Sequence, residues 1–199
     1  DTKNNGHKKF INETEILDLL QVIDGSKEDE NLLGFLDYDK IKEGRMCRHM
    51  VMVLPYCASC DAMEELLSKR KDAFKNLDEY EIINISGVDA GRIYKKPSDI
   101  KNKIKECEDS NKKTITLTVN RMLTGSTVEQ WDTMLYFKDT SSPQEYDQSI
   151  FRLQNQYIRT LSSEKGFIKE NLKPQTLLVD FDPDRLFRMQ EQKSLIYNV

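Results

Sequence analysis

The chain of 199 residues is long enough for one α/β domain with a sizeable core. With 38% hydrophobic and 32% charged residues it has no apolar run near the length that a membrane-spanning helix requires. A formal net charge of −4 excludes a protein that grips nucleic acid with its whole surface, so any such contact must be local. The four cysteines are too few for a disulfide scaffold, and no signal peptide is visible, which together indicate a reducing, cytoplasmic compartment.

The N-terminal region differs in pattern from the rest of the chain. We expect residues 1–46 to form a linker and a helical segment, with a helix over 12–23 where apolar residues recur at helical spacing. Residues 47–199 then read as one α/β domain. The chain starts without Met, which indicates an excised fragment or a processed chain, and we expect a fragment of a larger protein.

Apolar strands alternate with amphipathic helices along this domain. Strands are predicted at 49–54, 80–85, 114–119, 133–137 and 176–181, and helices at 61–76, 98–107, 143–160 and from 182 onward. Strands that alternate with helices and are apolar on both faces indicate a mostly parallel central sheet in a three-layer α/β/α fold. In such sheets ligands bind beyond the carboxyl ends of the strands. The loops of interest are therefore 55–60, 86–91, 120–131 and 138–142.

A hydroxyl-rich loop follows the third predicted strand. It runs from Thr118 to Val128 and contains one glycine, Gly125. Such a loop can present backbone N–H groups and side-chain oxygens to a phosphate. An ordinary strand-to-loop turn that uses Gly125 for a positive φ explains the same residues, and the two interpretations stay open.

The helix predicted from Pro143 carries two faces. Ser142 is a suitable N-cap and Glu145 completes a capping box. An apolar stripe is expected to face the core, made by Tyr146, Ile150, Leu153 and Tyr157. The opposite face carries Gln148, Arg152, Asn155 and Arg159, which are either solvated or present an arginine to a phosphate.

These segments together resemble motifs V and VI of superfamily-two helicases. The residues concerned are Met122-Leu123-Thr124-Gly125, a strand at 133–137, and then Gln148-x-x-x-Arg152. Residues 49–67 would correspond to motif IV, and the similarity covers roughly residues 48–160, most resembling the motor subunits of type I and related restriction enzymes. The resemblance implies a RecA-like fold, that of the second lobe of a P-loop NTPase helicase. It also implies an ATP-dependent DNA helicase or translocase, here one of a restriction-modification system.

The resemblance implies a role for each matching residue. Thr124, Gly125 and Thr127 would line an ATP cleft, while Gln148 and Arg152 would reach the γ-phosphate. Arg152 would act as an arginine finger that stabilises negative charge as the phosphoryl group departs. Contacts to the nucleic-acid backbone would come from Tyr56, Ser59 and Thr118.

The resemblance also implies partners. The sequence has no G-x-x-x-x-G-K-[ST] phosphate loop and no Asp-Glu pair after a strand for Mg²⁺. ATP and Mg²⁺ would therefore be bound jointly with an N-terminal RecA-like lobe of the same parent protein, and the isolated chain should not hydrolyse ATP. Other expected partners are DNA, through its backbone, and nuclease or methyltransferase subunits, but not a membrane.

The chain departs from the family pattern at three positions. Thr127 stands where Asp is expected, Asn155 where a second Arg is expected, and Phe151 where a small residue is expected. These departures favour an alternative in which the domain keeps the RecA-like fold but serves as a non-catalytic interaction module.

The cysteines offer a further alternative. A strand, then Cys57-Ala58-Ser59-Cys60, then a helix resembles the redox loop of thioredoxin-like thiol oxidoreductases, since a thiolate at a helix N-terminus is stabilised and nucleophilic. A metal site that combines Cys47 and His49 with this pair is excluded, because the intervening strand would separate the two pairs by about 20 Å. Four free thiols remain the simplest interpretation.

Overall fold

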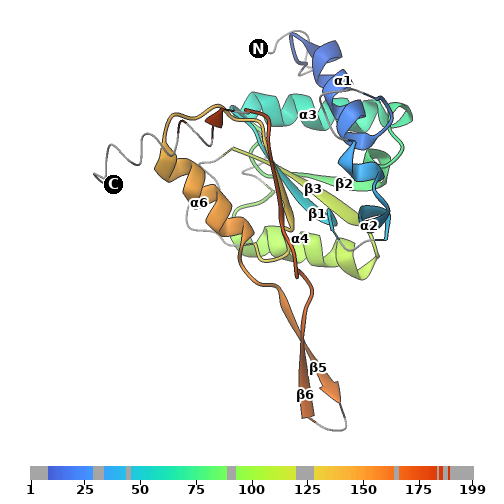
Figure 1. Cartoon of the computed structure of the whole chain (residues 1–199), viewed down its shortest axis with the longest axis vertical. Helices are drawn as coiled ribbons and strands as arrows, with labels where there is room; N and C mark the ends of the chain where they lie inside the picture. The colour runs from blue at the N-terminus through green and yellow to red at the C-terminus, as the bar shows by residue number, and fades with distance from the viewer. Residues whose placement is uncertain are drawn as a thin grey trace.

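A single parallel sheet forms the centre of the molecule (Figure 1). The computed structural model describes residues 9–28, 34–43, 46–88, 93–119, 128–163, 166–182, 184–185 and 188. Five strands pair in the order β2-β3-β1-β4-β7, and every pair is parallel. Their bounds are β1 (His49–Val53), β2 (Tyr80–Asn84), β3 (Lys113–Thr118), β4 (Thr133–Tyr136) and β7 (Leu177–Asp180). All five predicted strands are confirmed, with ends that differ by one or two residues.

The central strand β1 shows how the sheet separates two cores. Its five residues are all buried. Met50 and Met52 point into one hydrophobic cluster, and Val51 and Val53 into the other, because successive side chains of a strand alternate between its faces. A strand buried on both faces is apolar along most of its length, which explains the continuous apolar run after His49.

Helices cover both faces of the sheet (Figure 1). The cluster that contains Met50 is completed by α1 (Glu13–Asp24) and α3 (Cys57–Lys69), and the cluster that contains Val51 by α4 (Pro97–Asp109) and α6 (Pro143–Leu153). The molecule is therefore the predicted three-layer α/β/α fold with a parallel central sheet, consistent with a RecA-like domain. The N-terminal helix α1 packs against the same core as α3.

Short helical turns connect these layers. A four-residue helix, α2 (Asp39–Lys42), follows a 3₁₀ turn at Phe35–Asp37, and two more 3₁₀ turns lie at Lys71–Ala73 and Leu77–Glu79. The helix predicted over 61–76 corresponds to α3, which begins earlier, at Cys57, and ends at Lys69. No helix in the described part of the chain is long and apolar enough to span a membrane.

The carboxylate of Asp24 connects α1 to the segment before β2. Asp24 is the last residue of α1 and is fully buried. Its oxygens accept hydrogen bonds from the backbone N–H groups of Lys75, Asn76 and Leu77, at 2.8, 2.9 and 2.6 Å. Three backbone donors compensate for removing this carboxylate from water, so the buried carboxylate of Asp24 has a structural role.

The helix predicted over 143–160 ends early, and a β-hairpin begins within its last three residues. The helix α6 ends at Leu153, and the chain forms β5 (Ile158–Ser163) and β6 (Gly166–Asn171), an antiparallel pair that projects away from the sheet (Figure 1). The prediction was wrong because the apolar period of α6 happens to extend to Tyr157, whereas β-branched and apolar residues from Ile158 onward favour a strand. Tyr157 and Arg159 are consequently not on the helix.

Candidate functional site

The carboxyl edge of the sheet is where a ligand of an open parallel α/β fold is expected. Backbone hydrogen bonds hold the ends of its strands together: the Leu54 amide donates to the carbonyl of Thr118 at 2.8 Å, and the Phe137 amide donates to that of Val53 at 2.9 Å. The ends of β1, β3 and β4 therefore lie side by side. The side chains that follow these strands form the candidate site.

The residues predicted to line an ATP cleft lie outside the described part of the chain. Thr124, Gly125 and Thr127 fall in the gap between Val119 and Val128. Their roles stay predictions, as does the convergence of this turn with Arg152.

Ser86 joins the ends of β2 and β3. Its hydroxyl lies 3.1 Å from that of Thr118 and accepts a hydrogen bond of 3.1 Å from the Val119 amide. The Thr118 side chain is fully buried, and Ser86 is 4% exposed. Thr118 therefore fixes the point at which the loop after β3 begins, and its predicted contact with nucleic acid stays a prediction.

A second polar cluster lies beside Ser86 and was not recognised in the sequence. The Asn84 amide nitrogen donates to Asp61 Oδ1 at 2.9 Å and to Glu64 Oε2 at 2.8 Å. Asn84 Oδ1 accepts from the Gly87 amide at 2.8 Å, and Asp61 Oδ2 accepts from the Val88 amide at 3.0 Å. These bonds dock the loop after β2 onto the first half of α3. The only sequence signal was the Ser86-Gly87 pair that closes the strand.

Gly87 is required by this arrangement. A Cβ atom at position 87 would lie 2.0 Å from Asp61 Oδ1 and 2.6 Å from Asn84 Nδ2, well inside van der Waals contact. The carboxylate of Asp61 can therefore reach the loop only because residue 87 has no side chain.

Tyr56 and Ser59 lie at the start of α3, on the same edge. Tyr56 occupies the N-cap position without a side-chain cap, and the residue is 66% exposed. Ser59 follows in the first turn and is partly exposed. Both side chains reach solvent beyond the end of β1, and their contact with nucleic acid stays a prediction.

The predicted phosphate-binding pair lies on α6. Gln148 is exposed in the middle of the helix, and Arg152 is partly buried in its last turn, where burial lowers its pKa. The end of this helix lies near the amino edge of the sheet, because Lys173 Nζ donates at 3.0 Å both to the Leu153 carbonyl and to the carbonyl of Trp131, which precedes β4. Gln148 is thus nearer the carboxyl edge than Arg152.

The start of α6 is capped as predicted in one respect. Ser142 Oγ accepts a hydrogen bond of 3.3 Å from the Glu145 amide. The Glu145 carboxylate, however, pairs with Lys138 and accepts from Thr140 Oγ1 at 2.8 Å. These contacts hold the loop that follows β4 against α6.

Arg185 is buried beside the end of β7. The sequence places it on a helix from residue 182 onward, and in the structure the residue is 2% exposed. Its guanidinium pairs with Asp180 at the end of β7 and lies over the rings of Tyr136 and Tyr146, with centroid distances of 5.1 and 5.7 Å. This arginine was missed because sequence periodicity does not identify a buried cation. Most other residues of the predicted helix lie outside the described chain.

The two thiols of the Cys57–Cys60 segment differ in exposure. Cys57 is exposed at the first position of α3, but Cys60 is fully buried, and burial raises the pKa of its thiol to about 12. The two thiols are free. Within the described ranges, no group of three or more His, Cys, Asp or Glu side chains is placed to hold a metal ion.

Comparisons with known proteins give one clear relative. No protein-family model matches the chain. It is 30% identical over 188 residues to a protein of Mycoplasma pneumoniae that is named the C-terminus of a type II restriction enzyme and methyltransferase. The match covers 94% of this chain but only 24% of that protein, so the chain spans about a quarter of its relative.

A solved structure was also found. The C-terminal part of the Fun30 ATPase domain superimposes with a TM-score of 0.40 and 13% sequence identity, over 89% of this chain and 53% of that one. An overlap of this size carries no functional assignment, so similarity to known proteins rests on the sequence match to the restriction enzyme and methyltransferase.

Proposed function

We propose that the chain is the second RecA-like lobe of an ATP-dependent DNA helicase or translocase that serves a restriction-modification system. The observation that carries the proposal is the sequence match to the restriction enzyme and methyltransferase, which extends over 94% of the chain. It is supported by a parallel α/β/α fold and by the order of the helicase-like motifs along it.

In this proposal ATP is bound between two lobes. The loop with Thr124, Gly125 and Thr127 would contribute hydroxyl and backbone groups, and Gln148 its exposed amide. Mg²⁺ and the phosphate loop would come from the first lobe, because this sequence has no phosphate-loop motif. When bound, ATP supplies the phosphoryl group whose transfer drives movement along DNA.

The proposed role of Arg152 requires a particular placement of the first lobe. It lies one turn beyond Gln148 along α6, and the end of that helix is near the amino edge. A first lobe that covers the outer side of α6 would bring a phosphate within reach of the long guanidinium side chain. An arginine that stabilises the transferred phosphoryl group contributes about 10³-fold or more to kcat.

DNA would contact the start of α3. The exposed ring of Tyr56 offers a stacking surface, and Ser59 offers a hydroxyl to a phosphate. Such local contacts are compatible with a chain whose net charge is −4, because only a small patch of it would meet the DNA backbone.

The test uses the full-length parent protein with duplex DNA. We expect ATP turnover that depends on DNA and falls by about 10³-fold in Arg152→Ala, with a smaller loss in Gln148→Ala. Gln144→Ala, an exposed glutamine on the first turn of the same helix, is the matched control and should keep wild-type turnover.

Two results would contradict the proposal at different levels. Unchanged turnover in Arg152→Ala removes the arginine finger but leaves the motor. Absence of DNA-stimulated ATPase activity in the folded parent protein overturns the motor itself and favours a non-catalytic RecA-like interaction domain, which the substitutions at Thr127 and Asn155 already suggest.

A further inference from the structure

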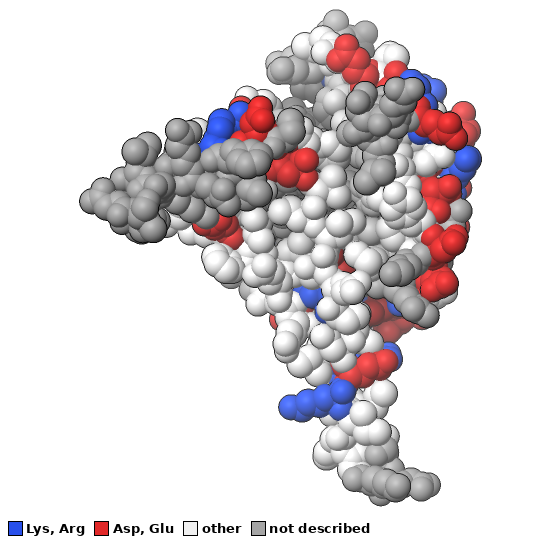
Figure 2. Space-filling view, viewed as in Figure 1, with Lys and Arg blue, Asp and Glu red and all other residues white. Residues whose placement is uncertain are grey.

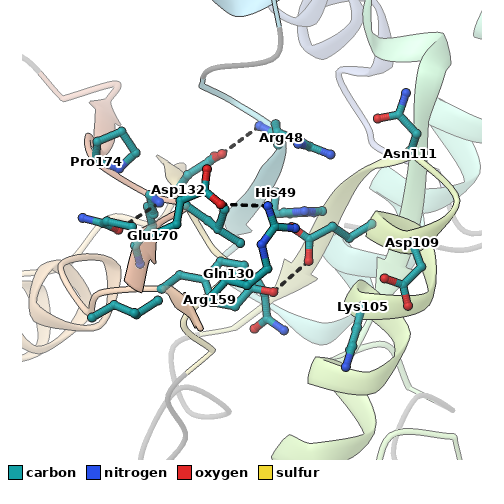
Figure 3. Close-up of a pocket in the computed structure, with 16 residues that line it drawn as sticks. Arg48, His49, Lys105, Asp109, Asn111, Gln130, Asp132, Arg159, Glu170 and Pro174 are labelled. Carbon is teal, nitrogen blue, oxygen red and sulfur yellow. Dashed lines mark hydrogen bonds and ion pairs between the residues drawn. The ribbon is translucent and has the colours of Figure 1, made fainter. Parts of the chain in front are cut away.

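A pocket of about 770 Å³ lies at the amino edge of the sheet, opposite the loops described above. His49 opens β1, Asp132 precedes β4 and Pro174 precedes β7, and all three line it. Its other walls are the end of α4 and the base of the β5–β6 hairpin. Figure 3 shows Asp132, His49 and Gln130 between the hairpin and α4.

Two buried polar atoms of this pocket lack a partner. Among the residues that the structure describes, neither His49 Nε2 nor Gln130 Oε1 makes a hydrogen bond, although His49 is only 3% exposed and Gln130 only 6%. Buried polar side-chain atoms are hydrogen-bonded in the large majority of folded proteins. Both residues line the pocket, so a bound molecule is placed to supply the missing partners.

The rest of each side chain is held in place. His49 Nδ1 lies 3.0 Å from the hydroxyl of Thr114, and Gln130 Nε2 donates to the carbonyl of Lys101 at 3.4 Å. The amide therefore presents an acceptor and the imidazole presents its second nitrogen. Burial lowers the pKa of His49 to about 4, so that the ring is neutral near pH 7.

The charges around the pocket are balanced. Four cations and four acids line it: Arg48, Lys105, Arg159, Lys173, Glu108, Asp109, Asp132 and Glu170. Several of these charged groups already have partners, since Arg159 pairs with Glu170 at 2.9 Å and Lys173 donates to two backbone carbonyls. Figure 2 likewise shows both signs of charge at the base of the hairpin. A balanced lining favours a neutral polar ligand over an ion.

Flat and apolar side chains complete the walls. Tyr157 is partly buried, and its hydroxyl donates to Glu108 Oε2 at 2.8 Å, which fixes the ring beside α4. Ile158 and Leu172 lie at the same side of the pocket, at the base of the hairpin. An aromatic ring held in one orientation offers a stacking surface to a planar ligand.

We propose that this pocket binds a neutral nitrogen heterocycle of the nucleobase type. The heterocycle would donate an N–H to Gln130 Oε1, exchange a second hydrogen bond with His49 Nε2 and stack on Tyr157. The pocket has the volume of a small-molecule site, about 300–1,000 Å³, and accommodates a nucleoside. The base would come either from a free nucleoside or from a nucleic-acid strand that presents an unpaired base.

The inference is independent of the proposed motor function, and its test does not measure ATPase activity. Adenosine, guanosine, cytidine and thymidine are titrated into the 199-residue chain by calorimetry and by saturation-transfer NMR. We expect at least one nucleoside to bind with a Kd that rises about tenfold, the effect of losing roughly one hydrogen bond or stacking contact, in Gln130→Leu and in Tyr157→Leu. Gln144→Leu changes an exposed glutamine on the first turn of α6, at the end of the helix remote from the pocket; it is the control and should bind normally.

A second arm identifies the source of the base. A single-stranded oligonucleotide that carries 2-aminopurine is added, and its fluorescence is followed with and without competing nucleoside. Binding that requires Gln130 and is displaced by the nucleoside indicates a base presented by a strand, and binding of the nucleoside alone indicates a free ligand.

Three results would overturn the proposal: no binding of any nucleoside or of the oligonucleotide by the folded chain, binding unchanged in both variants, or binding lost instead in Thr124→Ala, a residue of the predicted ATP loop. Because Tyr157 is only partly buried, Tyr157→Leu keeps the test decisive if Gln130→Leu does not fold; far-UV circular dichroism establishes folding for each variant.

Discussion

The guanidinium of Arg185 donates from Nε to both carboxylate oxygens of Asp180, at 3.0 and 2.8 Å. Asp180 is the last residue of β7, and the tyrosine rings at 136 and 146 cover the pair. Removal of either partner of an ion pair that is largely withdrawn from water strongly destabilises the fold, because the other charge is left uncompensated inside the protein.

We predict that Asp180→Asn destabilises the fold by about 3–5 kcal/mol, as expected for a buried ion pair that loses one member. Urea unfolding at pH 7 measures the change. Arg188→Gln is the control, since Arg188 is half exposed and pairs with Asp182 at the surface, and it should cost less than about 1 kcal/mol. Equal effects of the two substitutions would show that Arg185 is not held as described.

Asp132 and His49, which are neighbours at the amino edge, are predicted to change the free energy of unfolding with pH in opposite directions. Burial raises the pKa of Asp132 from 3.8 to about 6, and burial lowers the pKa of His49 from 6.5 to about 4. Folding favours the protonated carboxyl group of Asp132. Its contribution to the free energy of unfolding is therefore present below pH 3.8 and is lost as the pH rises through about 6. Folding also favours the neutral imidazole of His49. Its contribution to the free energy of unfolding is therefore present above pH 6.5 and is lost as the pH falls through about 4.

The two contributions offset each other in the wild-type protein and are separated by substitution. Relative to wild type, Asp132→Asn should lose about 3 kcal/mol of unfolding free energy between pH 6.5 and 4, and His49→Gln should gain about as much, at roughly 1.4 kcal/mol per pKa unit. Urea unfolding at half-unit intervals of pH gives both slopes. Slopes of the same sign in the two variants would contradict the assigned shifts.

Gly87→Ala is predicted to destabilise the loop after β2. The new methyl group would overlap Asp61 Oδ1, and overpacking of this kind costs about 1–3 kcal/mol. The double variant Gly87→Ala/Asp61→Ser shortens the offending side chain and should be no less stable than Asp61→Ser alone. Thermal unfolding of the four proteins, wild type included, closes this double-mutant cycle. An additive cycle would show that residues 61 and 87 do not meet.

The β5–β6 hairpin should contribute little to global stability. Phe167 is 81% exposed, and the described hairpin residues are absent from both hydrophobic clusters. We predict that Phe167→Ser changes the unfolding free energy by less than about 0.5 kcal/mol, as is usual for a surface substitution. Leu135→Ser, at a fully buried position of β4, is the contrasting variant and should cost several times more. Comparable losses would indicate that the hairpin packs against the body of the domain.

The parallel sheet could be predicted because its strands carry a strong signal. A strand such as β1, with all five residues buried, must be apolar on both faces, and the helices between the strands repeat their apolar residues at helical spacing. The hairpin could not be predicted by the same means. Tyr157 continues the apolar period of α6 by coincidence, and local periodicity does not reveal where a helix stops unless a Gly or Pro marks the end.

The candidate site was predictable only in outline. The edge of the sheet followed from the topology, and Tyr56 is exposed there, while its predicted contact with nucleic acid stays a prediction. The docking of Asp61 onto residues 84–88, the burial of Thr118 and the partners of Arg185 depend on contacts between residues far apart in the chain. No spacing rule encodes such contacts, because each depends on how the helices pack on the sheet.

Lys173 gives the projecting hairpin a mechanical connection to the domain. It follows β6 directly, and its ammonium binds the last turn of α6 and the segment that enters β4 through two backbone carbonyls. A load applied to the tip of the hairpin is thereby shared between a helix and a central strand at one buried point. The base of the hairpin is therefore tied to α6 and to the segment before β4 by one buried ammonium group.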